Sequence, residues 1–340
     1  MNNQQNGLSG LQNLGNTCFL NSAMQCFSHT HELNELLNNS NVLSKINDNN
    51  EAILLKEWNE LRKLLWTKNC IITPGGFVHN IQKVATILDN NNFSGWAQND
   101  LPEFIHFMMN GFHMGLARDV EINITGDSQN NKDRLATIAY TMIKDMYSKE
   151  YSEMIPIFFG IQLSTIKSLD GTVEKSIKAE PYFMIDLPIP PINTPSLLDC
   201  INLYIENETL DGDNAWYNDK TKQKENVIKT LQFWSLPTVL IIDLKRFNKI
   251  NFRKNNCYVD IPLNPIDLSK YVIGYQKDSY IYELYGICNH SGNVMGGHYT
   301  ANIKTENGWY HFNDRAVTKI TDQSKIVSPM AYCLFFRKKK

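Results

Sequence analysis

The sequence has no apolar run long enough to cross a membrane and no strong excess of charge of either sign. Its 340 residues include 33 basic and 35 acidic side chains, a formal net charge of −2. A nucleic-acid-binding surface needs an excess of positive charge, so we expect no nucleic-acid partner. A membrane-spanning helix needs ~20 apolar residues, and the polar residues 1–5 are unlike a signal peptide, so we expect no membrane association.

Cysteine is sparse and shows no pairing pattern. The seven cysteines are scattered along the chain without a Cys-x-x-Cys pair. An odd number of isolated cysteines favours reduced thiols, so we expect an intracellular protein of the cytoplasm or nucleus. Hydrophobic residues make up 42% of the chain, enough to bury one large core or two smaller ones. We find no internal repeat or long linker, and we expect a monomer.

One cysteine, Cys18, lies where a loop of Gly, Asn and Thr becomes an apolar helix. Asn16 or Thr17 can cap this helix, and the apolar residues recur at helical spacing: Phe19, Leu20, Ala23, Met24 and Phe27. A thiol at a helix start feels the partial positive charge of unpaired backbone N–H groups, which favours the nucleophilic thiolate. The structural alternative is that Cys18 is simply a small buried apolar residue.

A second group of polar residues lies near the far end of the chain. Gly296 and Gly297 precede His298, and glycines let backbone or a thin ligand approach an imidazole closely. Asn313 and Asp314 follow a Trp-Tyr-x-Phe strand pattern and can orient that imidazole. A cysteine early in the chain, with histidine and Asn or Asp late, is the pattern of a cysteine hydrolase.

Four segments in this order resemble those of the ubiquitin-specific proteases, which are papain-like cysteine deubiquitinases. The segments are Gly10–Gln25 around the cysteine, Gln98–Phe104, Leu236–Phe247 and Tyr285–Val317 around the histidine. Each is specific, and together they favour catalysis over a purely structural role for Cys18.

The resemblance implies one catalytic domain at residues 7–337, with tails at 1–6 and 338–340. Its fold would be α+β and papain-like, with a helical thumb lobe at residues 7–150 and a β-rich palm and fingers lobe at 151–337. The residue pattern agrees, because helical periodicity predominates in the first part and short β-type runs follow. The active site would lie in the cleft between the two lobes.

Apolar periodicity also locates individual elements. Helical stripes run from Ile53 to Leu65 and from Phe104 to Phe112. The second helix begins with Asp100 and Glu103 at capping-box spacing, and Pro102 lies in its first turn. The expected strands are Phe158–Ile166, Tyr182–Leu187, Val239–Leu244, Tyr280–Ile287 and Tyr299–Ile303.

The resemblance assigns the catalytic roles. Cys18 would attack the carbonyl of the C-terminal glycine of ubiquitin, and His298 would act as general base. His290 is a competing base, but its counterpart in the family lies outside the triad. Asn313 would orient His298, although an amide cannot stabilise an imidazolium by charge. Asp314 could share that role, and a turn-stabilising hydrogen bond would also explain it.

The resemblance also implies residues that bind the substrate. Asn13, five residues before Cys18, would donate a hydrogen bond to the oxyanion, and a loop asparagine with an unusual backbone angle is the alternative. Helix capping would by itself explain Asp100. A pair of glycines suits a narrow channel that selects a Gly-Gly tail by excluding bulkier side chains. The expected contacts of the ubiquitin tail are Asp100, Gly296, Gly297 and Tyr299.

The connection before the Trp-Tyr-x-Phe strand carries conflicting signals. Asn307-Gly308 favours a two-residue turn, which would place Asn302 opposite Asn313. His298 would then lie four residues further along its strand. For His298 to face Asn313, the connection must be a longer loop centred near residues 305–306, and we expect this longer loop.

The chain departs from many relatives where they carry a zinc ribbon in the fingers. The four positions of the two Cys-x-x-Cys pairs fall on Ser168, Gly171, Asn218 and Thr221. No thiolate or imidazole ligand remains there, so we expect no zinc and no other cofactor, and fingers stabilised by packing alone. Cys200 and Cys257 are isolated and form no substitute pair. Asn99 and Pro102 also depart from the usual segment of the thumb.

These observations predict a zinc-free deubiquitinase that hydrolyses isopeptide or peptide bonds after the C-terminal Gly of ubiquitin. Its partners would be ubiquitin and ubiquitinated proteins. Two alternatives stay open. One is a protease for another ubiquitin-like modifier that ends in Gly-Gly, and the other is a catalytically weak module that binds ubiquitin without cutting it.

Overall fold

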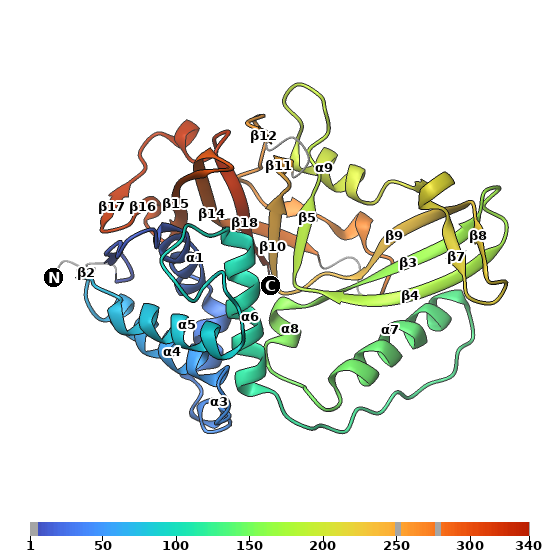
Figure 1. Cartoon of the computed structure of the whole chain (residues 1–340), viewed down its shortest axis with the longest axis horizontal. Helices are drawn as coiled ribbons and strands as arrows, with labels where there is room; N and C mark the ends of the chain where they lie inside the picture. The colour runs from blue at the N-terminus through green and yellow to red at the C-terminus, as the bar shows by residue number, and fades with distance from the viewer. Residues whose placement is uncertain (1–5, 249–252, 276–279, 340) are drawn as a thin grey trace.

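The computed structural model describes residues 6–248, 253–275 and 280–339. The polar start that we compared with a signal peptide lies outside the described residues, as does the last residue of the expected C-terminal tail. Helices predominate up to about residue 158 and strands follow, so a helical lobe adjoins a β-rich lobe (Figure 1). No helix in these three ranges has the length and apolar character that crossing a membrane requires.

The helical lobe surrounds α1, whose residues are all buried. The predicted helical stripes lie within α4 and α6, and Pro102 occupies the first turn of α6 as expected. The capping predictions are wrong, because the residues at the N-caps of α1 and α6, Thr17 and Asp100, make no side-chain capping hydrogen bond. The helices are α1 (Cys18–Ser28), α2 (His31–Asn38), α3 (Ser40–Leu43), α4 (Ala52–Thr67), α5 (Gly75–Ile87), α6 (Leu101–Leu116), α7 (Asn131–Tyr147), α8 (Ile155–Phe158) and α9 (Leu197–Tyr204).

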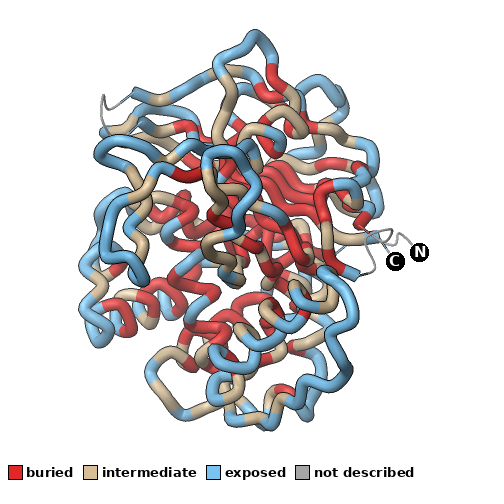
Figure 2. Tube along the Cα trace, turned by 90° about the vertical axis from the view of Figure 1, so that its right-hand side faces the viewer, coloured by how far each residue is buried: buried red, intermediate tan, exposed pale blue. Residues whose placement is uncertain are grey.

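The largest sheet of the described chain has eight strands and separates two hydrophobic clusters. Along β10, for example, Ile241 packs toward the helical lobe and Ile242 toward the opposite face that α9 covers. Burial on both faces explains its apolar run Val239–Ile242, and Figure 2 shows this buried centre in red. The strands in order are β17 (Ala316–Lys319), β16 (Gly308–Asn313), β15 (Gly296–Thr305), β14 (Ile281–Asn293), β18 (Ala331–Lys338), β10 (Val239–Leu244) and β5 (Met184–Leu187), with β13 (Ile266–Asp267) beside β14.

A second sheet extends away from the first and forms the fingers, together with a small hairpin (right of Figure 1). Helix α7 packs along one face, where Ala136 and Ala139 meet Leu163 and Trp234. The sheet order is β4 (Glu174–Tyr182), β3 (Gly160–Ser168), β9 (Val227–Ser235) and β6 (Glu208–Leu210), and the hairpin joins β7 (Trp216–Asn218) to β8 (Gln223–Glu225). The remaining short pairs are β1 (Gly10–Leu11) with β2 (Ile71–Ile72) and β11 (Phe247–Asn248) with β12 (Arg253–Lys254).

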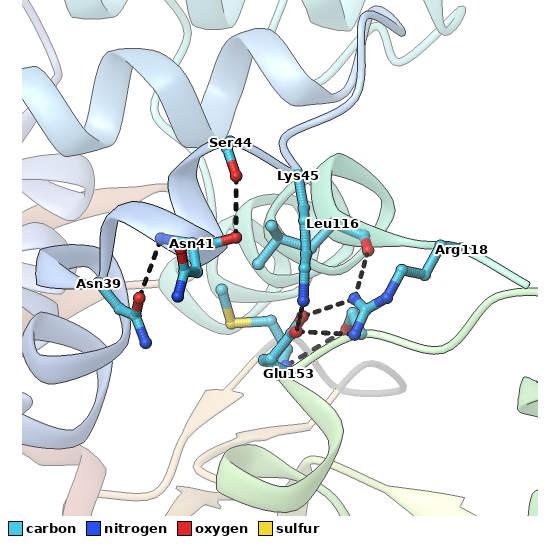
Figure 3. A network of polar contacts seen from close by, with 9 residues as sticks. Asn39, Asn41, Ser44, Lys45, Leu116, Arg118 and Glu153 are labelled. Carbon is cyan, nitrogen blue, oxygen red and sulfur yellow. Dashed lines mark hydrogen bonds and ion pairs between the residues drawn. The ribbon is translucent and has the colours of Figure 1, made fainter. Parts of the chain in front are cut away.

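An ion pair joins the two ends of the segment between α6 and α8, which contains α7. The Arg118 guanidinium donates to both carboxylate oxygens of Glu153 at 2.8 and 2.7 Å, and Lys45 lies 3.9 Å from the same carboxylate (Figure 3). Arg118 and Tyr151 also pair through their backbones. The two ends of the segment between α6 and α8 are therefore joined by hydrogen bonds.

The hairpin from β15 to β16 has a different register from both sequence-based alternatives. Thr305 pairs with Gly308, so the two-residue turn consists of residues 306–307 and no longer loop is present. The pairing ends at Ala301 and Phe312, and its continuation would place Thr300 opposite Asn313. His298 is then the diagonal neighbour of Asn313 on the same face of the sheet, a separation that side chains can bridge.

Candidate active site

Cys18 is the first residue of α1, and it lies against the strand that carries His298. α1 packs on β15, and the Cys18 side chain is buried, with 4% of the residue exposed. Burial raises the pKa of the Cys18 thiol, and the charge of Asp314 adds to this rise. Hydrogen bonds from the backbone of Tyr299, Phe19 and Cys18 itself lower the pKa but do not outweigh burial. The backbone N–H groups at the helix start favour the thiolate as expected, but burial outweighs them and the pKa is raised.

His298 is held by Asn313, as the sequence predicted for this pair. The Nε2 atom of His298 lies 2.7 Å from the Oδ1 atom of Asn313. Because an amide oxygen only accepts, Nε2 carries the proton and Nδ1 keeps its lone pair. α1 packs on β15, and the backbone of Tyr299 lowers the pKa of the Cys18 thiol, so the strand segment that carries His298 lies close to the thiol. A base with a fixed tautomer therefore lies next to the buried cysteine.

Asp314 contacts the loop before α1 instead of the imidazole. Its carboxylate accepts hydrogen bonds from the side-chain amides of Asn13 at 3.0 Å and Asn21 at 2.7 Å. The backbone N–H of Leu11 donates to its carbonyl oxygen. Asp314 has a φ of 49°, a left-handed conformation that Asp tolerates. The structure therefore assigns the contact with His298 to Asn313 and gives Asp314 a different set of partners.

Asn13 is fixed on both sides of its amide group. Its oxygen accepts from the backbone N–H groups of Gly15 and Thr17 at 3.0 and 3.2 Å, and from the Thr17 hydroxyl. One N–H donates to Asp314, which leaves the second N–H for a ligand. This network also explains why Thr17 does not cap α1.

His290 does not compete for Asn313. The ring is buried between aromatic side chains, with centroids 4.6 Å from Tyr299 and 5.3 Å from Phe247. Burial lowers the pKa of His290 to about 4, and the charge of Lys254 contributes. His290 is thus a neutral residue that lines the neighbouring pocket.

The predicted tail-binding residues surround one pocket of about 430 Å³ between the start of α6 and the β14–β15 turn. Asp100 accepts hydrogen bonds from the hydroxyls of Tyr299 at 3.3 Å and Tyr332 at 2.9 Å, and burial raises the pKa of its carboxyl. Capping therefore does not explain Asp100. The pocket lining includes Gln98, Asp100, Phe247, Gly296, Gly297 and Tyr299.

Three contacts of this region were missed from the sequence. Asn21 supports Asp314, Thr17 supports Asn13, and Gln98 bonds to Gly297 across the pocket. All three side chains lie in family-like segments, but the sequence did not show which partners they bind.

A cysteine at a helix start, a histidine on the adjoining strand and an asparagine bonded to that histidine form the arrangement of a cysteine hydrolase. A family model described as ubiquitin carboxyl-terminal hydrolase matches residues 9–336. Since this match covers nearly the whole chain, the protein belongs to the ubiquitin carboxyl-terminal hydrolase family.

Curated relatives agree with this assignment. The chain is 30% identical to Usp2 of Drosophila melanogaster over 339 residues, which cover 98% of this chain and 35% of that protein. It is 30% identical to human ubiquitin carboxyl-terminal hydrolase 2 over 345 residues, covering 97% of this chain and 55% of the relative. For human hydrolase 21 the identity is 29%, with 97% and 61% covered. The chain therefore spans between 35% and 61% of the length of these relatives.

Solved structures share the fold. The Ubp8/Sgf11/Sus1/Sgf73 DUB module of SAGA bound to monoubiquitin gives a TM-score of 0.74 at 23% identity, covering 99% of this chain and 70% of that chain. The same module bound to ubiquitin aldehyde gives 0.73 at 24% identity, covering 100% and 71%. The predicted α+β class is confirmed by this likeness.

The residues at the zinc-ribbon positions do not fit a zinc ion, because none offers a thiolate or imidazole. Two polar clusters occupy these positions instead. Asp170 accepts from Ser168 and Thr172 in the β3–β4 turn. Glu225 of β8 accepts from Asn218 at 2.6 Å and Thr221 at 2.9 Å and pairs with Lys175 of β4. The expectation of packing alone was therefore incomplete, since hydrogen bonds join the hairpin to the sheet.

Proposed function

We propose that residues 7–337 form a thiol-dependent deubiquitinase domain that hydrolyses isopeptide or peptide bonds after the C-terminal Gly of ubiquitin. The observation that carries this proposal is the contact between His298 Nε2 and Asn313, with the base beside Cys18. The relatives named as ubiquitin carboxyl-terminal hydrolases and the ubiquitin-bound neighbours support the choice of substrate.

The first step follows from the protonation states. The Cys18 thiol is neutral at rest, so His298 Nδ1 takes its proton as the sulfur attacks the carbonyl carbon of the terminal glycine. The oxyanion accepts from the second N–H of Asn13 and a backbone N–H near Cys18. His298 then gives the proton to the leaving amine, and a thioester to Cys18 remains.

The second step releases the modifier. Water attacks the thioester while His298 accepts its proton, and the Cys18 thiol is restored as the carboxylate of ubiquitin leaves. Asn313 accepts the Nε2–H of His298 throughout, so Nδ1 is the nitrogen that gains and loses the proton. No cofactor takes part in this scheme, and the fingers are held without zinc by the clusters around Asp170 and Glu225.

The proposed partners are ubiquitin and ubiquitinated proteins, with neither nucleic acid nor a membrane, and the enzyme acts as an intracellular monomer of the cytoplasm or nucleus. The net charge of −2 and the scattered cysteines support these parts of the proposal.

A ubiquitin molecule with an electrophile at its C-terminus tests the function. The probe should add one ubiquitin mass to the wild type and none to Cys18→Ala, with matching circular dichroism of both proteins. Labelling by a different Gly-Gly-ended modifier in preference to ubiquitin would favour the alternative substrate. Tight ubiquitin binding without labelling or turnover would favour the binding module.

A further inference from the structure

Gln98 of the thumb spans the pocket and bonds to the backbone of Gly297, the residue before His298. The N–H of Gly297 donates to Gln98 Oε1 at 2.9 Å, and Gln98 Nε2 donates to the carbonyl oxygen of Gly297 at 3.3 Å. Gln98 Nε2 also lies 3.4 Å from Asn16 Oδ1. One side-chain amide thus satisfies both polar groups of one backbone residue.

These two groups belong to the strand edge that faces the nucleophile. Residues i and i+2 of a β-strand turn their backbone N–H and C=O groups to the same edge of the strand. Gly297 binds Gln98 through both backbone groups, so Tyr299, two residues later, turns its backbone groups to the same edge, which β16 pairs with further along β15. β16 covers β15 only from Ala301 onward, and among residues 6–248, 253–275 and 280–339 no strand pairs with this part of the edge.

An extended chain that brings a carbonyl to Cys18 would run along this edge. Such a chain binds a strand edge through its own N–H and C=O groups. A primary amide carries the same donor and acceptor as one peptide unit, so Gln98 mimics the ligand that the edge is built to bind.

The backbone angle at residue 296 favours a glycine, and a side chain there would also meet Gln98. Gly296 has a φ of 153°, and a Cβ atom there would lie 2.5 Å from Gln98 Oε1. A Cβ at Gly297 would lie 2.2 Å from the carbonyl oxygen of Ser291. Protein atoms therefore occupy the positions of both Cβ atoms, while the glycines themselves line the pocket.

We infer that the Gln98 side chain occupies the position of one peptide unit of the substrate tail and that the tail displaces it on binding. The inference rests on the proposed function and names how access to that site is controlled. Displacement replaces the two hydrogen bonds to Gly297 by two from the tail and breaks the longer contact with Asn16, so the net free-energy cost is small. The apparent affinity for the tail falls by the fraction of molecules in which Gln98 is bound.

Replacing the glutamine tests this exchange. In Gln98→Ala, KM for a fluorogenic ubiquitin substrate should fall about fivefold while kcat stays unchanged, since only a competitor of the tail is removed. The matched control is Gln82→Ala, which removes a glutamine that donates to the Gly95 carbonyl oxygen elsewhere in the thumb, and it should leave KM unchanged.

A second measurement is independent of activity. Amide hydrogen exchange at Gly297 should be slow in the wild type and at least about fivefold faster in Gln98→Ala. Unchanged exchange, or a KM that stays level or rises, would overturn the inference in an enzyme that the ubiquitin probe labels. If the wild type is not labelled, the proposed function fails, while the exchange experiment still decides whether Gln98 binds Gly297.

Discussion

Replacing Asp314 by Asn should lower the turnover of substrate while it raises the reactivity of the Cys18 thiol. The Asp314 carboxylate holds Asn13 and Asn21 at 3.0 and 2.7 Å. An asparagine keeps one acceptor oxygen but turns an NH2 group toward the other amide, so one hydrogen bond is lost. Asn also tolerates the φ of 49°, whereas Ala would add backbone strain.

The expected loss of turnover follows from the role of Asn13. A hydrogen bond to a charged group contributes ~1.5–3 kcal/mol, and losing one oxyanion donor costs ~3 kcal/mol in other hydrolases. We therefore expect kcat to fall by roughly 10²-fold with KM little changed. At the same time the pKa of Cys18 should fall, because a negative charge that raises it has been removed.

The assay pairs steady-state kinetics with alkylation of Cys18 by iodoacetamide across pH. The variant should react faster at neutral pH and turn over more slowly. The reasoning would be refuted by full turnover, or by an alkylation profile that keeps its midpoint or moves to higher pH. A thermal melt excludes unfolding as the cause of faster alkylation.

Three other predictions concern separate contacts. Asn313→Ala should lower kcat by roughly 10²-fold or more because His298 loses its tautomer, whereas Asn313→Asp should retain turnover, and an inactive but folded Asn313→Asp would contradict the assignment. Burial raises the pKa of Glu153, but hydrogen bonds from Arg118 outweigh it, so the pKa is lower in the folded protein than in the unfolded chain. The ion pair therefore stabilises the fold above pH ~4.3, the pKa of an unfolded Glu, and this stabilisation is lost as the pH falls through the pKa of the folded state. Glu153→Gln should therefore cost about 1 kcal/mol in denaturant melts at pH 7 and less at pH 3. Chelators should leave the melting temperature unchanged, and a melting temperature that drops with chelation would contradict zinc-free fingers. Glu225→Ala should speed amide hydrogen exchange in the β7–β8 hairpin.

The spacing of apolar residues in the sequence correctly predicted several helices and strands. The stripe from Ile53 to Leu65 lies within α4, and the run Val239–Leu244 is β10 itself. The Cys18 and His298 segments could be joined because their motifs are specific. These inferences succeed because burial of one face fixes the spacing of apolar residues.

Contacts between distant segments could not be read in the same way. The capping box at Asp100 fits the sequence, yet two tyrosine hydroxyls from β15 and β18 bind this side chain. The Asn307-Gly308 signal was offset by one residue, because the register of β15 and β16 centres the turn on residues 306–307. Only the tertiary arrangement shows which of several local options is used.

The placement of Asp314 explains how a site with an amide as its third member can still use a negative charge. At rest the nucleophile and the residue that orients His298 are neutral, since burial raises the pKa of Cys18 and Asn313 carries no charge. Asp314 lies behind Asn13, the proposed oxyanion donor, where it accepts one N–H of the amide and polarises that group. A carboxylate beside the imidazole would stabilise the ion pair before the reaction begins. A carboxylate behind Asn13 acts through a donor whose bond to the substrate strengthens as the oxyanion forms, so its effect is greatest in the transition state.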